Sequence, residues 1–165
     1  MSRKYFIETY GCQMNVHDSE RMAGLLDQAG YDPTPDEGDA DVIVINTCSV
    51  RERSEEKLFT RLGEIRQRAL EEGSRPVVAV AGCVAQQEGD RILRRSKAVD
   101  VIIGTQNIRR LPVLVGGAID APGRTPIVEL APLDDVSFPL GIARRQDRVK
   151  AYVTIIEVCN EFCAF

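Results

Sequence analysis

The chain has 165 residues, of which 44% are hydrophobic and 28% are charged, and its formal net charge is −4. This composition is typical of a globular domain of ordinary size with some chain to spare, and it excludes a low-complexity protein. No apolar run approaches the ~20 residues of a membrane-spanning helix, and the N-terminus lacks a signal-peptide pattern, so we expect a cytoplasmic protein without a membrane partner. The acidic balance argues against a main nucleic-acid-binding surface on this chain.

Strand and helix patterns alternate along the first part of the chain. A β-prone run at 5–9 is followed by a helical apolar stripe at 18–29, and the uninterrupted apolar run at 42–45 is typical of a parallel strand covered on both faces. The later predicted elements are a helix with Leu58, Leu62, Ile65 and Ala69 on one face that ends near Gly73, a strand at 77–81, a helix at 90–97, a strand at 101–103, and a helix at 109–116 with Pro112 near its first turn. This alternation predicts an α/β fold with a doubly wound, mainly parallel sheet and flanking helices.

The pattern changes after Gly117. Residues 118–147 hold four of the eight prolines and show no clear helical periodicity, which predicts an extended linker. A new strand is predicted at 149–156, and it leads directly into Cys159 and Cys163. We therefore divide the chain into an N-terminal domain (3–117), a linker (118–147) and the start of a second domain (148–165).

Three cysteines each follow the carboxyl end of a predicted strand. Cys12, Cys48 and Cys83 are separated by 36 and 35 residues. The carboxyl ends of parallel strands meet at the ligand-binding edge of an open sheet, so these distant thiols can converge there. Gly11 and Gly82 would let the backbone turn tightly beside a bulky group. Three thiolates suit a 4Fe–4S cluster with one iron left open, whereas four suit a closed electron-transfer cluster.

The cysteine spacing alone leaves other interpretations open. Free cysteines are often small buried hydrophobes, and from spacing alone this is the commoner case. A zinc site would need His17, the single histidine, as a fourth ligand. A dithiol redox site would need a CxxC motif, which these three cysteines lack. The alternative function is therefore a noncatalytic, flavodoxin-like α/β binding module with buried structural cysteines, although the sequence has no Gly-rich phosphate loop.

Four polar residues near the strand-end cysteines are further candidates. They are Gln13, Asn15, Ser19 and Arg51. One interpretation is that they hydrogen-bond a group held by the thiols or its substrate, although for Arg51 a plain surface position is the commoner case. For Asn15 and Ser19 we favour a second interpretation, in which these side chains cap the following helix.

Several longer motifs resemble the radical-SAM methylthiotransferase family, and the resemblance extends over essentially the whole chain. The matching runs are YGCQMN (10–15) with DSERM (18–22), NTCSVRE (46–52) with EEK (55–57), and GCVAQ (82–86). They are similar to the tRNA-modifying, MiaB-type branch. The ribosomal-protein-modifying branch usually has Pro-Lys in place of the Gln-Met pair of the first run.

The resemblance implies two iron–sulfur sites. Cys12, Cys48 and Cys83 would bind an auxiliary 4Fe–4S cluster. Cys159 and Cys163 resemble the first two ligands of the CxxxCxxC motif, whose cluster binds S-adenosylmethionine, and the third ligand would follow the last residue of the sequence. On its own, a CxxxC pair is a weak metal signal.

The resemblance also implies a reaction. Family members of this branch are transferases that add a methylthio group to carbon 2 of an isopentenyl-adenosine next to the anticodon of tRNA, with an electron donor such as flavodoxin. They continue into a catalytic partial barrel and an RNA-binding β domain. We therefore expect an N-terminal portion that ends with the first strand of a truncated radical-SAM barrel and that is inactive alone.

Overall fold

The computed structural model describes residues 2–49, 52–121, 123, 125–131, 141–145, 147 and 149–153, and at positions 52 and 53 it describes the backbone only. The elements in chain order are β1 (Lys4–Tyr10), α1 (Gln13–Gln28), β2 (Asp32–Pro33), the 3-10 helix η1 (Glu37–Asp39), β3 (Val42–Thr47), α2 (Glu52–Glu72), β4 (Val77–Ala81), α3 (Cys83–Glu88), α4 (Asp90–Arg95), β5 (Val101–Ile103), the 3-10 helix η2 (Thr105–Arg110), α5 (Leu111–Asp120) and β6 (Ile127–Glu129). Among the described residues, no helix has the length and apolar character needed to span a membrane.

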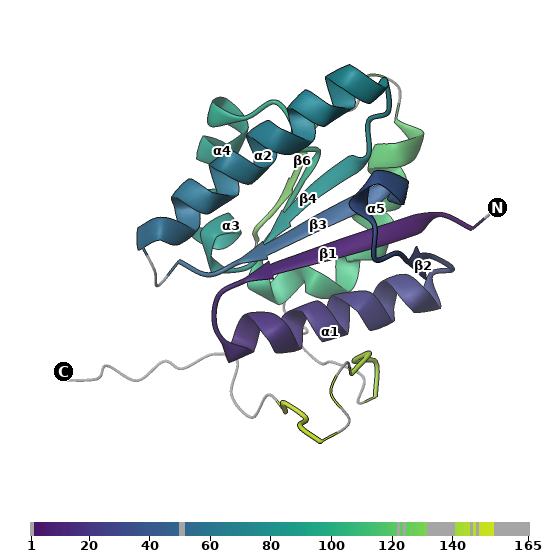
Figure 1. Cartoon of the computed structure of the whole chain (residues 1–165). Coiled ribbons are helices and arrows are strands. Elements are labelled where there is room, and N and C mark those ends of the chain that lie inside the picture. Colours follow the sequence, from purple (N-terminus) through teal and green to yellow (C-terminus); the bar gives the residue numbers. More distant parts are fainter. Residues whose placement is uncertain are drawn as a thin grey trace.

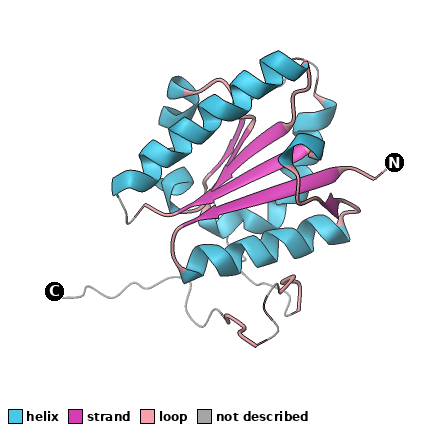
Figure 2. Cartoon of the chain, viewed as in Figure 1, coloured by secondary structure: helices cyan, strands magenta, loops and turns pink. Residues whose placement is uncertain are grey.

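Six parallel strands form one sheet in the order β2-β1-β3-β4-β5-β6. Helices α1 and α5 cover one face, and α2, α3 and α4 cover the other (Figures 1 and 2). This arrangement confirms the predicted doubly wound α/β fold. The chain adds β2 on one side of β1 and all later strands on the other, so the direction of winding reverses between β1 and β3. Such a reversal point is where open α/β sheets bind their ligands, at the carboxyl ends of the strands.

Both faces of the central strands are buried. Every residue of β3 and β4 is buried, because helices pack on the two sides of these strands. Met22 and Leu26 of α1 belong to one apolar layer, and Leu58 and Leu62 of α2 belong to the other, as the helical spacing of the two leucines predicted. The two layers hold the carboxyl ends of the strands in a fixed arrangement.

The structure departs from the predicted elements in several places, of which three concern the start of α1 and the segment after Gly117. Helix α1 begins at Gln13, five residues before the predicted start at position 18, because Cys12 occupies its N-cap position. Strand β6 lies inside the predicted linker and pairs with β5, so the sheet continues beyond Gly117. Residues 149–153 form no strand, and the rest of the strand predicted there lies outside the described residues.

A segment of the predicted linker, residues 141–145, packs along α1, and we call it the strap. The backbone N–H of Arg144 donates to the carbonyl of Glu20 at 2.8 Å, and its guanidinium pairs with Asp27 at 3.0 Å. A Cβ added at Gly24 would overlap the carbonyl oxygen of Ile142. Glycine at this helix position therefore allows the strap to lie directly on the helix backbone.

Replacing Gly24 with alanine is expected to lift the strap from α1. The extra methyl group occupies the space of the Ile142 carbonyl, while alanine itself favours the helix by about 0.5–1 kcal/mol. Hydrogen exchange at the Arg144 amide should become roughly tenfold faster or more, with little change in global stability. Gly63→Ala on α2 is the control, since no atom lies within 4 Å of its added Cβ. A protected Arg144 amide in Gly24→Ala would contradict the role of Gly24.

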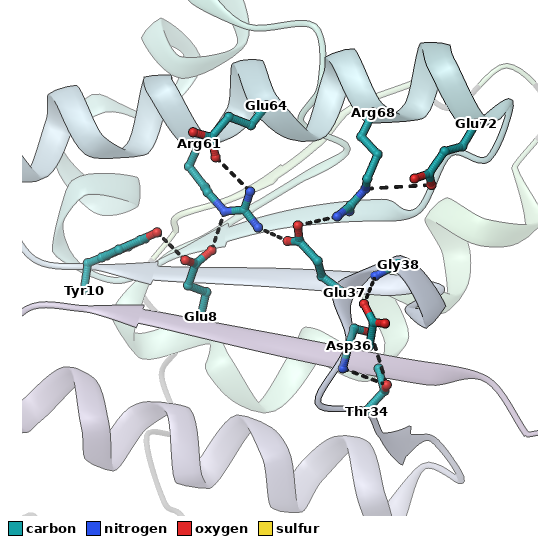
Figure 3. A network of polar contacts seen from close by, with 10 residues as sticks. All are labelled: Glu8, Tyr10, Thr34, Asp36, Glu37, Gly38, Arg61, Glu64, Arg68 and Glu72. Atoms are coloured by element: carbon teal, nitrogen blue, oxygen red, sulfur yellow. Dashed lines mark hydrogen bonds and ion pairs between the residues drawn. The ribbon is translucent and has the colours of Figure 1, made fainter.

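A polar network joins β1, η1 and α2 on the opposite face (Figure 3). Arg61 of α2 donates to Glu8 of β1 at 2.7 Å and also pairs with Glu37 of η1, which contacts Arg68 as well. The Tyr10 hydroxyl donates to Glu8, and burial together with this hydrogen bond and the Glu8 charge raises the pKa of Tyr10 to about 12. The network fixes α2 over the strand that leads to the first cysteine.

Candidate functional site

The three strand-end cysteines lie at one edge of the sheet, after three adjacent strands. Cys12 follows β1, Cys48 follows β3 and Cys83 follows β4, and these strands are neighbours in the sheet. Thr9, Asn46 and Ala81 are aligned in register just before the cysteine loops. The structure therefore brings the three thiols to the carboxyl ends of β1 and β3, between which the winding reverses, and of the adjacent strand β4.

Direct contacts connect the three cysteine loops. The backbone N–H of Cys48 donates to the carbonyl of Tyr10 at 3.0 Å, and a Cβ added at Gly11 would lie 2.5 Å from the Cβ of Cys48. The Cys48 thiol also hydrogen-bonds Cys12. The backbone N–H of Ser49, the next residue, hydrogen-bonds the Cys83 thiol. The Cys48 loop is therefore the centre of the group.

The surroundings of the thiols differ. Partial burial acts to raise the pKa of Cys12, but the backbone N–H groups of Asn15 and Met14 and the Cys48 thiol outweigh it, so the pKa of Cys12 lies below its ordinary value of 9.0. Burial, followed by the nearby Cys48 and Cys12, raises the pKa of Cys83 above that value, and the Ser49 N–H only partly offsets this. Cys12 is exposed to solvent, whereas Cys48 is only 2% exposed.

These differences predict the order of alkylation in the metal-free chain. The thiolate is the reacting form, so a lowered pKa and exposure together favour Cys12. At mildly alkaline pH, iodoacetamide should modify Cys12 first, Cys83 more slowly and Cys48 last. Cys12 should also keep its reactivity to a lower pH than Cys83. Mass-spectrometric mapping against pH measures both trends, and earlier modification of Cys83 would contradict them.

The three thiols are the donor set that this site offers to an iron–sulfur cluster. Within the described part of the chain, no three His, Cys, Asp or Glu side chains are already arranged as a metal site. The three thiols nevertheless match the ligand chemistry of a cluster with one open iron. Gly11 and Gly82 have φ values of 145° and 92°, and an added Cβ would collide with Asn15 and Cys48 at Gly11 and with the end of β3 at Gly82. Glycine at these two positions therefore lets the loops approach closely, and the three thiols fit such a group.

A buried polar network lies directly beneath the Cys12 loop. Asn15 accepts from the backbone N–H of Cys12 at 3.2 Å, which completes a capping box at the start of α1. Asn15 therefore has a capping role, as we favoured, but from the third helical position rather than from the N-cap. Ser19 makes no cap: it hydrogen-bonds Asn46 at 2.9 Å and Thr9 at 2.7 Å.

Other candidates from the sequence lie at the margin of the site or outside the described residues. Gln13 and His17 line a surface hollow beside Cys12, together with Tyr152 and Val153. Among the described residues, His17 does not join the thiols in a group of three metal ligands. Arg51, Cys159 and Cys163 lie outside the described residues.

Residues 4–104 match a family model described as "Uncharacterized protein family UPF0004". The match covers more than half of the chain, runs from β1 through β5 and includes all three strand-end cysteines. The chain belongs to the UPF0004 family. The terminal cysteine pair lies beyond the residues that define this membership.

Two relatives of this UPF0004 chain are the proteins named tRNA-2-methylthio-N(6)-dimethylallyladenosine synthase of Streptomyces coelicolor and of Streptomyces viridosporus. Each is 44% identical over 169 residues, which cover 99% of this chain and 32% of the relative. The similarity confirms the expected resemblance to the tRNA-modifying branch. The chain spans about a third of the length of these relatives.

One residue beneath the cysteine loops was not singled out from the sequence. Asn46 is fully buried and hydrogen-bonds both Asn15 and Ser19. The available signal was its place as the first polar residue after the apolar run at 42–45. A buried amide at a strand end must find polar partners, and these partners lie far away along the chain.

Proposed function

We propose that this chain is the N-terminal part of a tRNA methylthiotransferase and that Cys12, Cys48 and Cys83 hold a 4Fe–4S cluster. The observation that carries the proposal is the meeting of these three cysteines at the carboxyl ends of three adjacent strands. The names of the two relatives support the reaction class, since both are tRNA methylthio-adenosine synthases. Such an enzyme acts where tRNA is modified, in the cytoplasm.

The described residues have distinct tasks in this proposal. When bound, a cluster held by three protein thiolates supplies an iron with an open coordination position for sulfur chemistry. Cys12 at the N-terminus of α1 is favoured as a thiolate by the helix dipole and by backbone N–H groups. Cys48 is shielded from water and holds the buried side of the group, while Gly11 and Gly82 keep the loops close.

The rest of the proposed reaction depends on the last residues of this chain and on parts of the relatives that it does not span. Residues 148–165 would begin the radical-SAM domain, with Cys159 and Cys163 as the first two ligands of a second 4Fe–4S cluster that binds S-adenosylmethionine. The substrate is the isopentenyl-adenosine next to the anticodon of tRNA, methylthiolated at carbon 2, and a reductant such as flavodoxin supplies electrons. The base must leave its stack to be reached.

Anaerobic reconstitution of the 165-residue chain with ferrous iron and sulfide tests the cluster. To remove the terminal pair from consideration, the starting protein is the Cys159→Ala/Cys163→Ala variant. It should bind roughly four irons per chain, with a broad absorption in the blue. Adding Cys48→Ala should abolish the bound iron.

Equal iron in the chains with and without Cys48 would refute the cluster assignment. The three cysteines would then be structural, and the chain would remain an α/β binding module. The fold of Cys48→Ala is checked by circular dichroism and urea unfolding, so that loss of iron is not confused with loss of structure.

A further inference from the structure

Asn46 occupies the central position beneath the three cysteine loops. It lies near the end of β3, two residues before Cys48, and it is fully buried. Its neighbours in register are Thr9 of β1 and Ala81 of β4, the strands that lead to the other two cysteines. Its position alone places it next to all three loops.

The amide of Asn46 makes three hydrogen bonds to α1. Its Nδ2 donates to the carbonyl of Asn15 at 2.8 Å and to Oγ of Ser19 at 2.9 Å, and its Oδ1 accepts from Nδ2 of Asn15 at 3.0 Å. The side-chain oxygen of Asn15 in turn accepts from the N–H of Cys12 at 3.2 Å and lies 3.4 Å from the Cys12 sulfur. A continuous chain of hydrogen bonds thus runs from β3 to the first cysteine.

The same amide also restricts which residue can precede Cys83. A Cβ added at Gly82 would lie 2.6 Å from Oδ1 of Asn46, so only glycine fits between this amide and Cys83. One side chain therefore contacts the residue before Cys83, is bonded through Asn15 to Cys12, and is two residues from Cys48.

No common substitute reproduces these contacts. Aspartate at position 46 would lack both donors and would place a charge opposite the carbonyl of Asn15 and the hydroxyl of Ser19. Leucine would leave the Asn15 amide and the Ser19 hydroxyl without this partner in a buried place. A fully satisfied buried network of this kind is rigid, and rigidity at this point fixes the distances between the loops.

We propose that Asn46 is a positioning residue that ties the three cysteine loops together and so keeps a cluster bound by them from being lost. This inference rests on the proposed cluster, because it concerns how firmly the three thiols hold it. Asn46 does not touch the cluster in this scheme: it acts through Asn15 and through the Gly82 loop.

The test measures how fast a chelator removes the cluster from the reconstituted chain, followed by visible absorbance. Asn46→Ala should lose its cluster roughly 10- to 100-fold faster than the unsubstituted chain, the usual cost of losing a partner of a metal ligand. Asn15→Ala is a second variant, which breaks the same connection from the side of α1, and its fold is checked by circular dichroism. The double variant should be no faster than Asn46→Ala, because both changes break the same connection.

Val42→Ala is the matched control. Val42 is fully buried on the same strand and the same face as Asn46, but at the end remote from the cysteines. The Val42→Ala substitution should lower the free energy of unfolding measured in urea. It should leave the rate of cluster loss unchanged. Cluster loss as fast in Val42→Ala as in Asn46→Ala, or unchanged loss in Asn46→Ala, would overturn the positioning role.

A measurement without metal separates this inference from the proposed function. In the metal-free chain, Asn46→Ala should make the buried Cys48 react with iodoacetamide roughly tenfold faster, because loss of the hydrogen bonds loosens the loops. Unchanged Cys48 reactivity contradicts the tie between loops. A chain that holds no iron even with Asn46 present refutes the proposed cluster and the role of Asn46 in keeping it, whatever the alkylation rate.

Discussion

Replacing Gly82 with alanine is expected to lower the free energy of unfolding by about 3 kcal/mol and to prevent iron binding. Gly82 has φ 92° and ψ −167°, a conformation that is almost confined to glycine. The added Cβ would also collide with the carbonyl oxygen of Thr47 and the side chain of Asn46, which belong to the central strand and cannot move aside cheaply. The loop that carries Cys83 would have to move away from the Cys48 loop. Urea unfolding and iron content after reconstitution measure the two effects.

Gly73→Ala separates backbone strain from collision. Gly73 also has a positive φ, 66°, but no atom lies within 4 Å of its added Cβ. It should cost only about 1 kcal/mol and leave iron binding unchanged. If Gly82→Ala and Gly73→Ala destabilise equally and both bind iron, close packing of the cysteine loops is not what Gly82 provides.

Replacing Arg61 with methionine is expected to destabilise the fold by about 2 kcal/mol, less than for a fully buried pair because solvent still reaches these groups. The Arg61 side chain is 15% exposed and pairs with Glu8 at 2.7 Å, and it also contacts Glu37 and Glu64. Methionine keeps most of the volume but leaves Glu8 and Glu37 without this cation. The free energy of unfolding at neutral pH is the measurement.

Two further variants test the cause. Adding Glu8→Gln to Arg61→Met removes one of the three carboxylates that pair with Arg61 and should recover part of the loss, which a double-mutant cycle quantifies. Arg66→Met on the exposed side of the same helix should change stability by no more than about 0.5 kcal/mol. Equal losses for Arg61→Met and Arg66→Met would show that the network in Figure 3 contributes nothing specific.

Strands β4 and β5 were predictable to the residue, whereas β3 extends two residues beyond the apolar run predicted at 42–45. The runs at 77–81 and 101–103 are wholly apolar and have clear boundaries, and they form β4 and β5 with these same limits. The buried face of α2 was also predicted, because its leucines recur at helical spacing. These signals are strong since burial of an entire strand or helix face requires a continuous pattern.

The short elements at the edges were not predictable. Strand β6 has three residues, none of them fully buried, and it lies within a proline-containing stretch. Strand β2 has two residues. Short strands have little pattern of their own, and their formation depends on the neighbour with which they pair. The contact between the strap and Gly24 likewise joins segments far apart along the chain.

The candidate site was also predictable only where it depends on local sequence. The sequence by itself determined the α/β alternation and the placement of Cys12, Cys48 and Cys83 after strand-forming runs, because both depend on residues close together in the chain. Only the tertiary structure decided that β1, β3 and β4 are neighbours, and that Asn46 bonds Asn15, 31 positions away. Strand order and buried hydrogen bonds are set by packing between segments that are distant in the chain. Local sequence patterns do not indicate which of these segments will pack together.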